Sequence, residues 1–203
     1  MSVSRRDLFR LGAAGSGALV LSMTLPGCAS HPGREPSREG SWAPNAWLEL
    51  DPDGGVVFTL DRVEMGQGTY TGITTLVAEE LDVPPEQIEV RFAPVGPDYI
   101  NPQYQLQVTG GSTSLRTSWE RIRTGAASVR HVLLVSAAEV WQIDTDRITT
   151  RDAAVYHPDG NQSLAYAELV SLASSQSLPD SVELKSSDEF RYIGKYDRRL
   201  DAR

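Results

Sequence analysis

The spacing of hydrophobic residues predicts two main helices in the body of the chain. Over residues 69–81 apolar side chains recur every three or four positions, and the proline pair at 84–85 ends that helix. A longer helix is predicted to begin at Leu115 and to run to Val140 and Trp141. Its apolar stripe consists of Leu115, Trp119, Ile122, Ala126, Val129 and Leu133.

Short β-prone runs separate and flank these helices. Residues 47–50 and 56–60 enclose a turn-rich cluster and predict a hairpin, and residues 88–92 alternate as in a strand with one buried face. The turn at 157–160 predicts a second hairpin, followed by a short helix near 166–174 and a polar tail. The order β-β-α-β-α-β with a short helix indicates an α+β fold, an α/β sandwich with a mixed sheet and two main helices.

The first 45 residues have the composition of an export leader and a tether. Ser4, the arginine pair Arg5 and Arg6, and a mildly hydrophobic run at 11–25 predict a twin-arginine signal peptide over residues 1–28. Such a leader directs a folded protein to the periplasm. Residues 29–45 are rich in proline, glycine and serine and predict a flexible linker.

Cys28 allows two interpretations. Residues 25–28 resemble a lipoprotein cleavage box, in which Cys28 is lipidated and anchors the protein to the membrane. Alternatively, cleavage occurs nearby and the cysteine is incidental. Both interpretations place the mature protein in the periplasm.

The net charge and the cysteine content exclude several classes of partner and of metal site. The formal net charge of −8 argues against a nucleic-acid partner. Cys28 is the only cysteine, so this polypeptide alone cannot form an internal disulfide, a cysteine-ligated zinc site or an iron–sulfur cluster. The three histidines lack metal-binding spacing, so no metal site is predicted.

Two glycine-bearing turns, each directly before a helix, are the candidate binding sites. Free backbone N–H groups and the helix dipole favour an anion there, and the pair predicts a phosphate-bearing ligand. The alternative is that glycine, serine and threonine only start the helices, as they commonly do. The first turn is formed by Gly66, Gln67 and Gly68, and the second by Thr109, Gly110, Gly111, Ser112, Thr113 and Ser114.

Other polar and aromatic residues receive structural interpretations. Glu79 and Glu80 have no paired acid in the sequence and are predicted to lie on a solvated helix face. Trp119 lies on the apolar stripe of the long helix and is predicted to pack in the core or at its rim. No nucleophile elbow or serine–histidine–acid arrangement is present, so no catalytic residue is predicted.

Five motifs occur in the order EMGQG, AEELDV, TGGSTSLRTSW, FRYIGK and RRLD, behind an SRRDLF leader. With these motifs, residues 46–203 resemble the N-terminal part of the large subunit of isoquinoline 1-oxidoreductase-like and membrane-bound aldehyde dehydrogenases. These enzymes belong to the xanthine dehydrogenase and aldehyde oxidase superfamily of molybdenum hydroxylases. The resemblance implies a partial molybdopterin-binding domain.

The resemblance also implies a cofactor and partners. The cofactor is molybdopterin cytosine dinucleotide, whose dithiolene holds the molybdenum. Gln67 would contact the pterin, and Thr109, Gly111, Ser112, Thr113 and Ser114 would bind the pyrophosphate or the pterin. The implied partners are the remainder of the molybdenum subunit, a small subunit with two [2Fe-2S] clusters, in some cases a cytochrome c, and the twin-arginine translocase.

Family subunits are several times longer than 203 residues, and their catalytic glutamate lies beyond the part that this chain matches. Two functions are therefore expected. The first is a cofactor-binding portion of a periplasmic hydroxylase that oxidises an aldehyde or an N-heterocycle with water as the oxygen source. The second is a truncated, exported binding module without catalytic activity.

Overall fold

A computed structural model describes residues 36–202 of the chain. The predicted signal peptide, Cys28 and the first part of the predicted linker lie outside the described residues. None of the helices between residues 36 and 202 is long and apolar enough to cross a membrane.

The first sheet is mixed and has the order β1-β2-β3. Strands β1 (Leu48–Leu50) and β2 (Val56–Leu60) form the predicted antiparallel hairpin, with Leu48 opposite Phe58. Strand β3 (Ile88–Phe92) lies parallel to β2, with Val56 opposite Ile88. Parallel neighbours need a crossover connection, and helix α2 supplies it.

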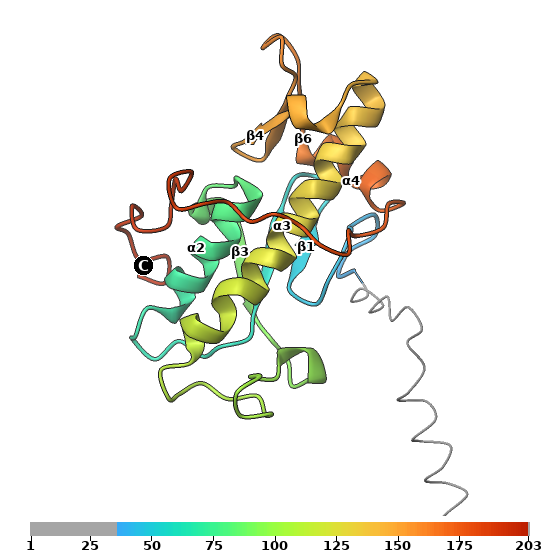
Figure 1. Ribbon diagram of the computed structural model, residues 1–203. Coiled ribbons are helices and arrows are strands. Elements are labelled where there is room, and N and C mark those ends of the chain that lie inside the picture. The colour runs from blue at the N-terminus through green and yellow to red at the C-terminus, as the bar shows by residue number, and fades with distance from the viewer. Residues whose placement is uncertain (1–35, 203) are drawn as a thin grey trace, which may run out of the picture. The chain divides into compact units, whose positions relative to one another are not determined.

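Helices α2 (Thr69–Leu81) and α3 (Ser114–Trp141) lie next to each other in front of this sheet (Figure 1). The two helices are in close contact near their N-terminal ends, where a Cβ on Gly72 would come within 3.4 Å of the Leu115 side chain. Apolar residues from both helices and from the sheet form one core. The predicted helices and the α+β class are confirmed.

A second, antiparallel sheet follows α3 and has the order β4-β5-β6. Its strands are β4 (Thr149–Arg151), β5 (Ala154–Tyr156) and β6 (Ser163–Ala165), and the predicted short helix α4 (Tyr166–Ala173) comes next. The Tyr166 hydroxyl donates to the Leu81 carbonyl at 2.7 Å, which joins α4 to the end of α2. Three short 3₁₀ helices complete the secondary structure of the described residues: η1 (Pro85–Gln87), η2 (Pro97–Tyr99) and η3 (Thr145–Arg147).

The segment after α4, residues 174–202, contains no helix or strand and passes over α3 and α2 (Figure 1). This C-terminal segment corrects the interpretation of Glu79 and Glu80, since both side chains are fully buried. Glu79 accepts hydrogen bonds from the backbone N–H groups of Arg191, Tyr192 and Ile193 at 2.8–3.0 Å. The predicted solvated face of α2 is therefore the contact face for the C-terminal segment.

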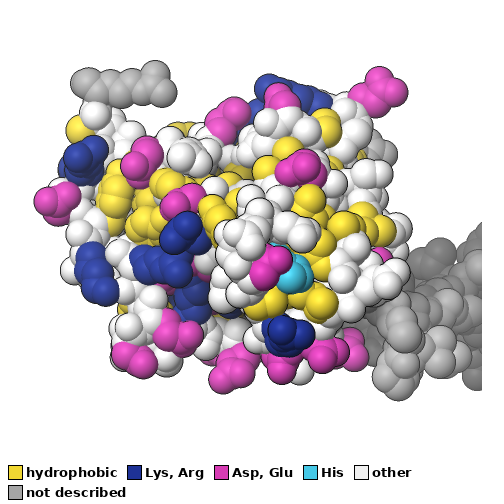
Figure 2. Space-filling view, turned by 90° about the horizontal axis from the view of Figure 1, so that it is seen from above, with side chains coloured by type: hydrophobic (Ala, Val, Ile, Leu, Met, Phe, Trp, Pro, Cys, Tyr) yellow, Lys and Arg dark blue, Asp and Glu magenta, His cyan; other side chains and the backbone are white. Residues whose placement is uncertain are grey.

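Charged side chains surround this contact. Glu80 accepts from Arg123 Nε at 2.8 Å, and burial raises the pKa of Glu80 although Arg123 opposes the shift. Asp82, just after α2, pairs with Lys185 at 2.6 Å and Arg191 at 3.2 Å. The space-filling view from above likewise shows basic side chains next to acidic ones, between apolar areas (Figure 2).

The start of the α3 stripe and the end of the predicted linker differ from the expected pattern. Trp119 and Leu115 are 41% and 46% exposed, because the apolar stripe of α3 enters the core only from Ile122 onward. Trp119 therefore packs at the rim, edge-on to Phe190 and next to the Arg123 guanidinium. The end of the predicted linker belongs to the fold, since Trp42 is buried and exchanges backbone hydrogen bonds of 2.8 and 2.9 Å with Leu50.

Candidate functional site

The two predicted turns lie at the same end of the fold. The first precedes α2 and the second precedes α3, and Val63 near the first donates its N–H to Thr109 Oγ1 in the second at 2.8 Å. This contact joins positions 46 residues apart in the sequence. The structure thus brings together the two segments that sequence analysis selected, while their role in binding stays a prediction.

The amides of the first turn already have an acceptor within the chain. Glu64 Oε1 accepts from the N–H groups of Gly66 and Gly68 at 2.7 and 3.1 Å, and Oε2 accepts from Tyr70 at 2.8 Å. Partial burial raises the pKa of Glu64, but these three N–H groups outweigh it and leave the pKa below its usual value. Glu64 therefore takes the place of an external anion at the start of α2, which sequence analysis did not foresee.

Gln67 is exposed but holds its own loop together. Its Nε2 donates to the Val63 carbonyl at 2.8 Å, and its Oε1 accepts from the Met65 N–H at 2.6 Å. Gly66 and Gly68 have φ values of 96° and 82°, in the left-handed region that glycine adopts freely. A side chain at position 67 is thus presented at the surface by a rigid turn.

The second turn is more open to a ligand. Gly111 and Ser112 both have left-handed φ values, 59° and 53°. Within residues 36–202, no group accepts a hydrogen bond from the backbone N–H of Gly111 or Ser112. Two adjacent unpaired N–H groups before a 28-residue helix suit an anion such as a phosphate.

Thr113 anchors this turn. Its side chain is fully buried, donates to the Gly110 carbonyl at 2.8 Å and accepts from Asn101 Nδ2 at 2.7 Å. Asn101 is also buried, and sequence analysis missed it because it lies in a polar loop without a regular pattern. Thr113 therefore has a positioning role, and the exposed Ser112 and the half-buried Ser114 are more accessible to a ligand.

A buried ion pair lies beneath the two turns. Asp61 and Arg62 side chains are fully buried and 3.0 Å apart, and Arg121 also contacts the Asp61 carboxylate. Burial raises the pKa of Asp61 against the opposing effect of the two arginines, and burial lowers the pKa of Arg62. Arg62 Nη2 donates to Thr117 Oγ1 at 3.1 Å, which links the end of β2 to the first turns of α3.

This pair forms part of the wall of a cavity of about 290 Å³ between the turns. Asp61 Oδ1 and Arg62 Nε have no hydrogen-bond partner within the described part of the chain. Charged residues directly after a buried strand were the available sequence signal for this pair. The cavity is lined by Leu60, Asp61, Arg62, Val63, Glu64, Phe92, Ala93, Gln107, Val108 and Thr109.

The C-terminal segment also reaches the first turn. Arg199 donates to the Gly66 carbonyl at 3.3 Å and lies 3.4 Å from Glu64 Oε1. The next residue, Leu200, donates its N–H to Thr71 Oγ1 at 3.0 Å. The RRLD motif therefore contacts EMGQG, just as FRYIGK contacts AEELDV through Glu79.

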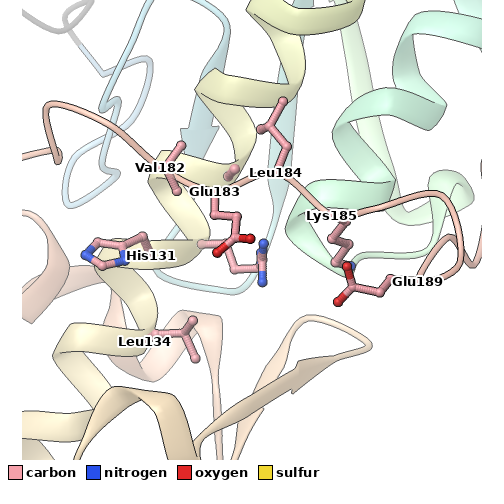
Figure 3. Close-up of a pocket in the computed structure, with 9 residues that line it drawn as sticks. His131, Leu134, Val182, Glu183, Leu184, Lys185 and Glu189 are labelled. Carbon is pink, nitrogen blue, oxygen red and sulfur yellow. The ribbon is translucent and has the colours of Figure 1, made fainter.

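A second cavity, of about 330 Å³, lies between α3 and the C-terminal segment (Figure 3). His131 and Leu134 line it from α3, and Glu183, Lys185 and Glu189 line it from the segment. None of the predicted site residues borders this cavity. The described residues also contain no cluster of three or more His, Cys, Asp or Glu side chains suited to a metal ion.

Several curated proteins are similar to this chain in sequence. The beta subunit of isoquinoline 1-oxidoreductase from Brevundimonas diminuta is 33% identical over 68% of this chain and 18% of its own length. A membrane-bound aldehyde dehydrogenase from Gluconacetobacter polyoxogenes is 25% identical over 77% of this chain and 20% of its own length. The chain thus spans about a fifth of the length of these two relatives.

A third relative, one of the subunits of nicotinate dehydrogenase from Pseudomonas putida, is 28% identical over 73% of this chain and 12% of its own length. Among solved structures, a chain of Cu,Mo-CO dehydrogenase aligns with a TM-score of 0.49 and 18% identity, covering 69% of this chain and 18% of the other. The family of molybdopterin cofactor-binding domains matches residues 15–201. The chain therefore belongs to the molybdopterin cofactor-binding domains of the xanthine dehydrogenase family of molybdenum hydroxylases.

Proposed function

We propose that this chain binds part of a molybdopterin cytosine dinucleotide and contributes it to a molybdenum hydroxylase completed by further polypeptide. The turn before α3 carries the proposal, because its Gly111 and Ser112 N–H groups are unpaired within the described residues. Thr109 of the same turn accepts from Val63, at the base of the loop that presents Gln67. The family to which the chain belongs supports a molybdopterin cofactor as the anion, and the cytosine dinucleotide form belongs to the proposal.

The two turns have different roles in this proposal. The Gly111 and Ser112 N–H groups and the Ser112 and Ser114 hydroxyls would hold the phosphates. Gln67 would reach the pterin by giving up its contacts within the loop, while Gly66 and Gly68 shape that loop around Glu64. A Cβ on Gly66, Gly68 or Gly110 would meet nothing within 4 Å, so there is room beside these glycines.

When bound, the cofactor supplies the two-electron redox chemistry of the molybdenum centre. The proposed reaction is RH + H₂O → ROH + 2 H⁺ + 2 e⁻, with an aldehyde or an N-heterocycle as RH. The electrons would leave through a small [2Fe-2S] subunit and in some cases a cytochrome c. The base would come from the remaining polypeptide.

The proposed location is the periplasm, reached by twin-arginine export after the cofactor is loaded, with Cys28 as a lipid anchor. Changing Arg5 and Arg6 to lysine is expected to hold the protein in the cytoplasm. Fractionation of cells would test export, and metabolic labelling with palmitate would test lipidation of Cys28. Unchanged export of the double-lysine variant would contradict the proposed route.

The site assignment is tested by cofactor content. A Gln67→Ala, Ser112→Val double variant is expected to lose molybdenum and the cytosine nucleotide from the assembled complex, since a β-branched residue disfavours the left-handed φ at position 112. Gln176→Ala serves as the control, because this half-buried glutamine bonds to Glu139 and lies outside both turns. Unchanged molybdenum occupancy in the double variant would remove the assignment.

The non-catalytic module makes the opposite prediction for the unmodified chain. Wild-type protein from a molybdate-supplied host that also produces the neighbouring subunits would then contain neither metal nor nucleotide. The same preparation therefore decides between the two functions.

A further inference from the structure

Exposed apolar side chains gather at the end of the fold that carries the two turns. Within residues 36–202, the exposed large hydrophobic side chains all lie between positions 63 and 119, apart from Val140 and Leu178. Four of them, here called the apolar rim, are Val63, Phe92, Val95 and Leu106, which are 55%, 56%, 97% and 52% exposed. Folding of this chain alone leaves them in water.

Two residues of the apolar rim border the cavity between the turns, and the other two belong to a loop that also lines it. Val63 and Phe92 both line that cavity. Val95 and Leu106 belong to the loop after β3, in which Gln107 bonds to the Pro94 carbonyl at 3.0 Å and to the Gly96 N–H at 3.2 Å. These bonds close the loop and hold its two arms together beside the cavity.

The rim also adjoins the proposed cofactor residues. Val63 donates to Thr109 at the start of the second turn, and Val63 receives the Gln67 side chain at its carbonyl. Exposed apolar clusters commonly mark surfaces that contact another protein, a membrane or a ligand.

We propose that the apolar rim is the surface on which the rest of a molybdopterin-binding subunit docks. The inference rests on the proposed function and adds the location of the contact. The length comparison favours this occupant over a second copy, because about four-fifths of the isoquinoline 1-oxidoreductase and aldehyde dehydrogenase relatives lies outside the part this chain matches. In this proposal the remaining polypeptide meets this domain where the cofactor is shared.

Site-specific photo-crosslinking in the source organism tests the location. A benzophenone amino acid at position 92 is expected to crosslink to a polypeptide that mass spectrometry identifies by its molybdopterin-binding sequence. The same amino acid at position 140 is the matched control, since Val140 is 53% exposed. A crosslink from 92 to a second copy or to an unrelated protein, equal crosslinking from 140, or no crosslink at all would overturn the proposal.

Charge substitutions give a second measurement. Val63→Asp with Phe92→Asp is expected to lower co-purification of that polypeptide at least tenfold, whereas Val140→Asp leaves it unchanged. Both proteins should remain folded with cooperative unfolding, because the substituted side chains are more than half exposed. Equal co-purification of both variants would also overturn the proposal.

The experiments can reject the proposed docking surface and the proposed cofactor binding independently of each other. Crosslinking at position 92 in molybdate-starved cells, together with absence of cofactor in molybdate-fed cells, would support docking and reject cofactor binding. Retention of cofactor without a crosslink at position 92 would support cofactor binding and reject the docking surface.

Discussion

The carboxylate of Glu79 accepts a hydrogen bond from the backbone N–H of Ile193, 114 residues further along the chain, at 2.9 Å. A fully buried carboxylate in α2 thereby fixes a segment that has no secondary structure of its own. The same segment continues to Arg199 and the first turn. The geometry of the candidate site thus depends on contacts made by the last residues of the chain.

Replacing Glu79 with alanine is expected to release this segment. The N–H groups of residues 191–193 lose their acceptor, which costs about 3 kcal/mol of unfolding free energy. Urea unfolding would measure the loss, and limited proteolysis should cleave first within residues 185–201. Glu120→Ala, at an exposed position on α3, is the control and should match wild type.

Glu64 is expected to make the first turn pH-dependent. The pKa of Glu64 in the folded protein lies below 4.5, so its contribution to stability is present above pH 4.5 and is lost as the pH falls through the folded value. Glu64→Gln should therefore cost about 1–2 kcal/mol at pH 7 and progressively less below pH 4.5.

Unfolding curves of wild type and Glu64→Gln at several pH values would check this dependence. Hydrogen exchange of the Gly66, Gly68 and Tyr70 amides should also be faster in the variant. A stability difference that does not change with pH would contradict the assigned role of the carboxylate.

Gly110 and Gly111 are adjacent but should respond differently to alanine. A Cβ at position 111 would lie 2.1 Å from the Tyr104 hydroxyl oxygen, and φ there is +59°. Gly111→Ala is expected to cost about 1–3 kcal/mol, although a shift of the exposed Tyr104 side chain can relieve part of the clash. Gly110→Ala should be within about 0.5 kcal/mol of wild type, because its Cβ would enter open space.

Thermal or urea unfolding of both glycine variants would check this contrast. Equal stability of the two would mean that the loop around Tyr104 does not pack against the second turn as described.

The buried pair of Asp61 and Arg62 is expected to show strong coupling. Asp61→Ala leaves a buried guanidinium without its main partner and should cost about 3–5 kcal/mol. Combining it with Arg62→Met removes the unpaired charge, so the double variant should be more stable than Asp61→Ala alone. A double-mutant cycle measured by urea unfolding would detect the coupling, and additive effects would contradict it.

Local sequence patterns determined much of the fold. The helix over residues 69–81 and the strand over residues 88–92 have the predicted bounds, because each is encoded by side-chain periodicity and by prolines at its end. The two glycine turns were also found from sequence, since glycine and hydroxyl residues before a helix are a local signal. The resemblance of the five motifs to the xanthine dehydrogenase family is confirmed by the family match.

Only the tertiary structure decided which polar groups form hydrogen bonds within the chain. Glu79 and Glu80 have the sequence of a solvated helix face, but the C-terminal segment buries them through contacts of more than 100 residues in separation. Glu64 fills the turn that sequence analysis treated as free, whereas the Gly111 and Ser112 amides stay unpaired among the described residues. The periodicity of the sequence shows which face of a helix or strand is apolar. It cannot show which distant segment supplies a hydrogen-bond partner to the polar face. That partner determines whether a polar group remains free to bind a ligand.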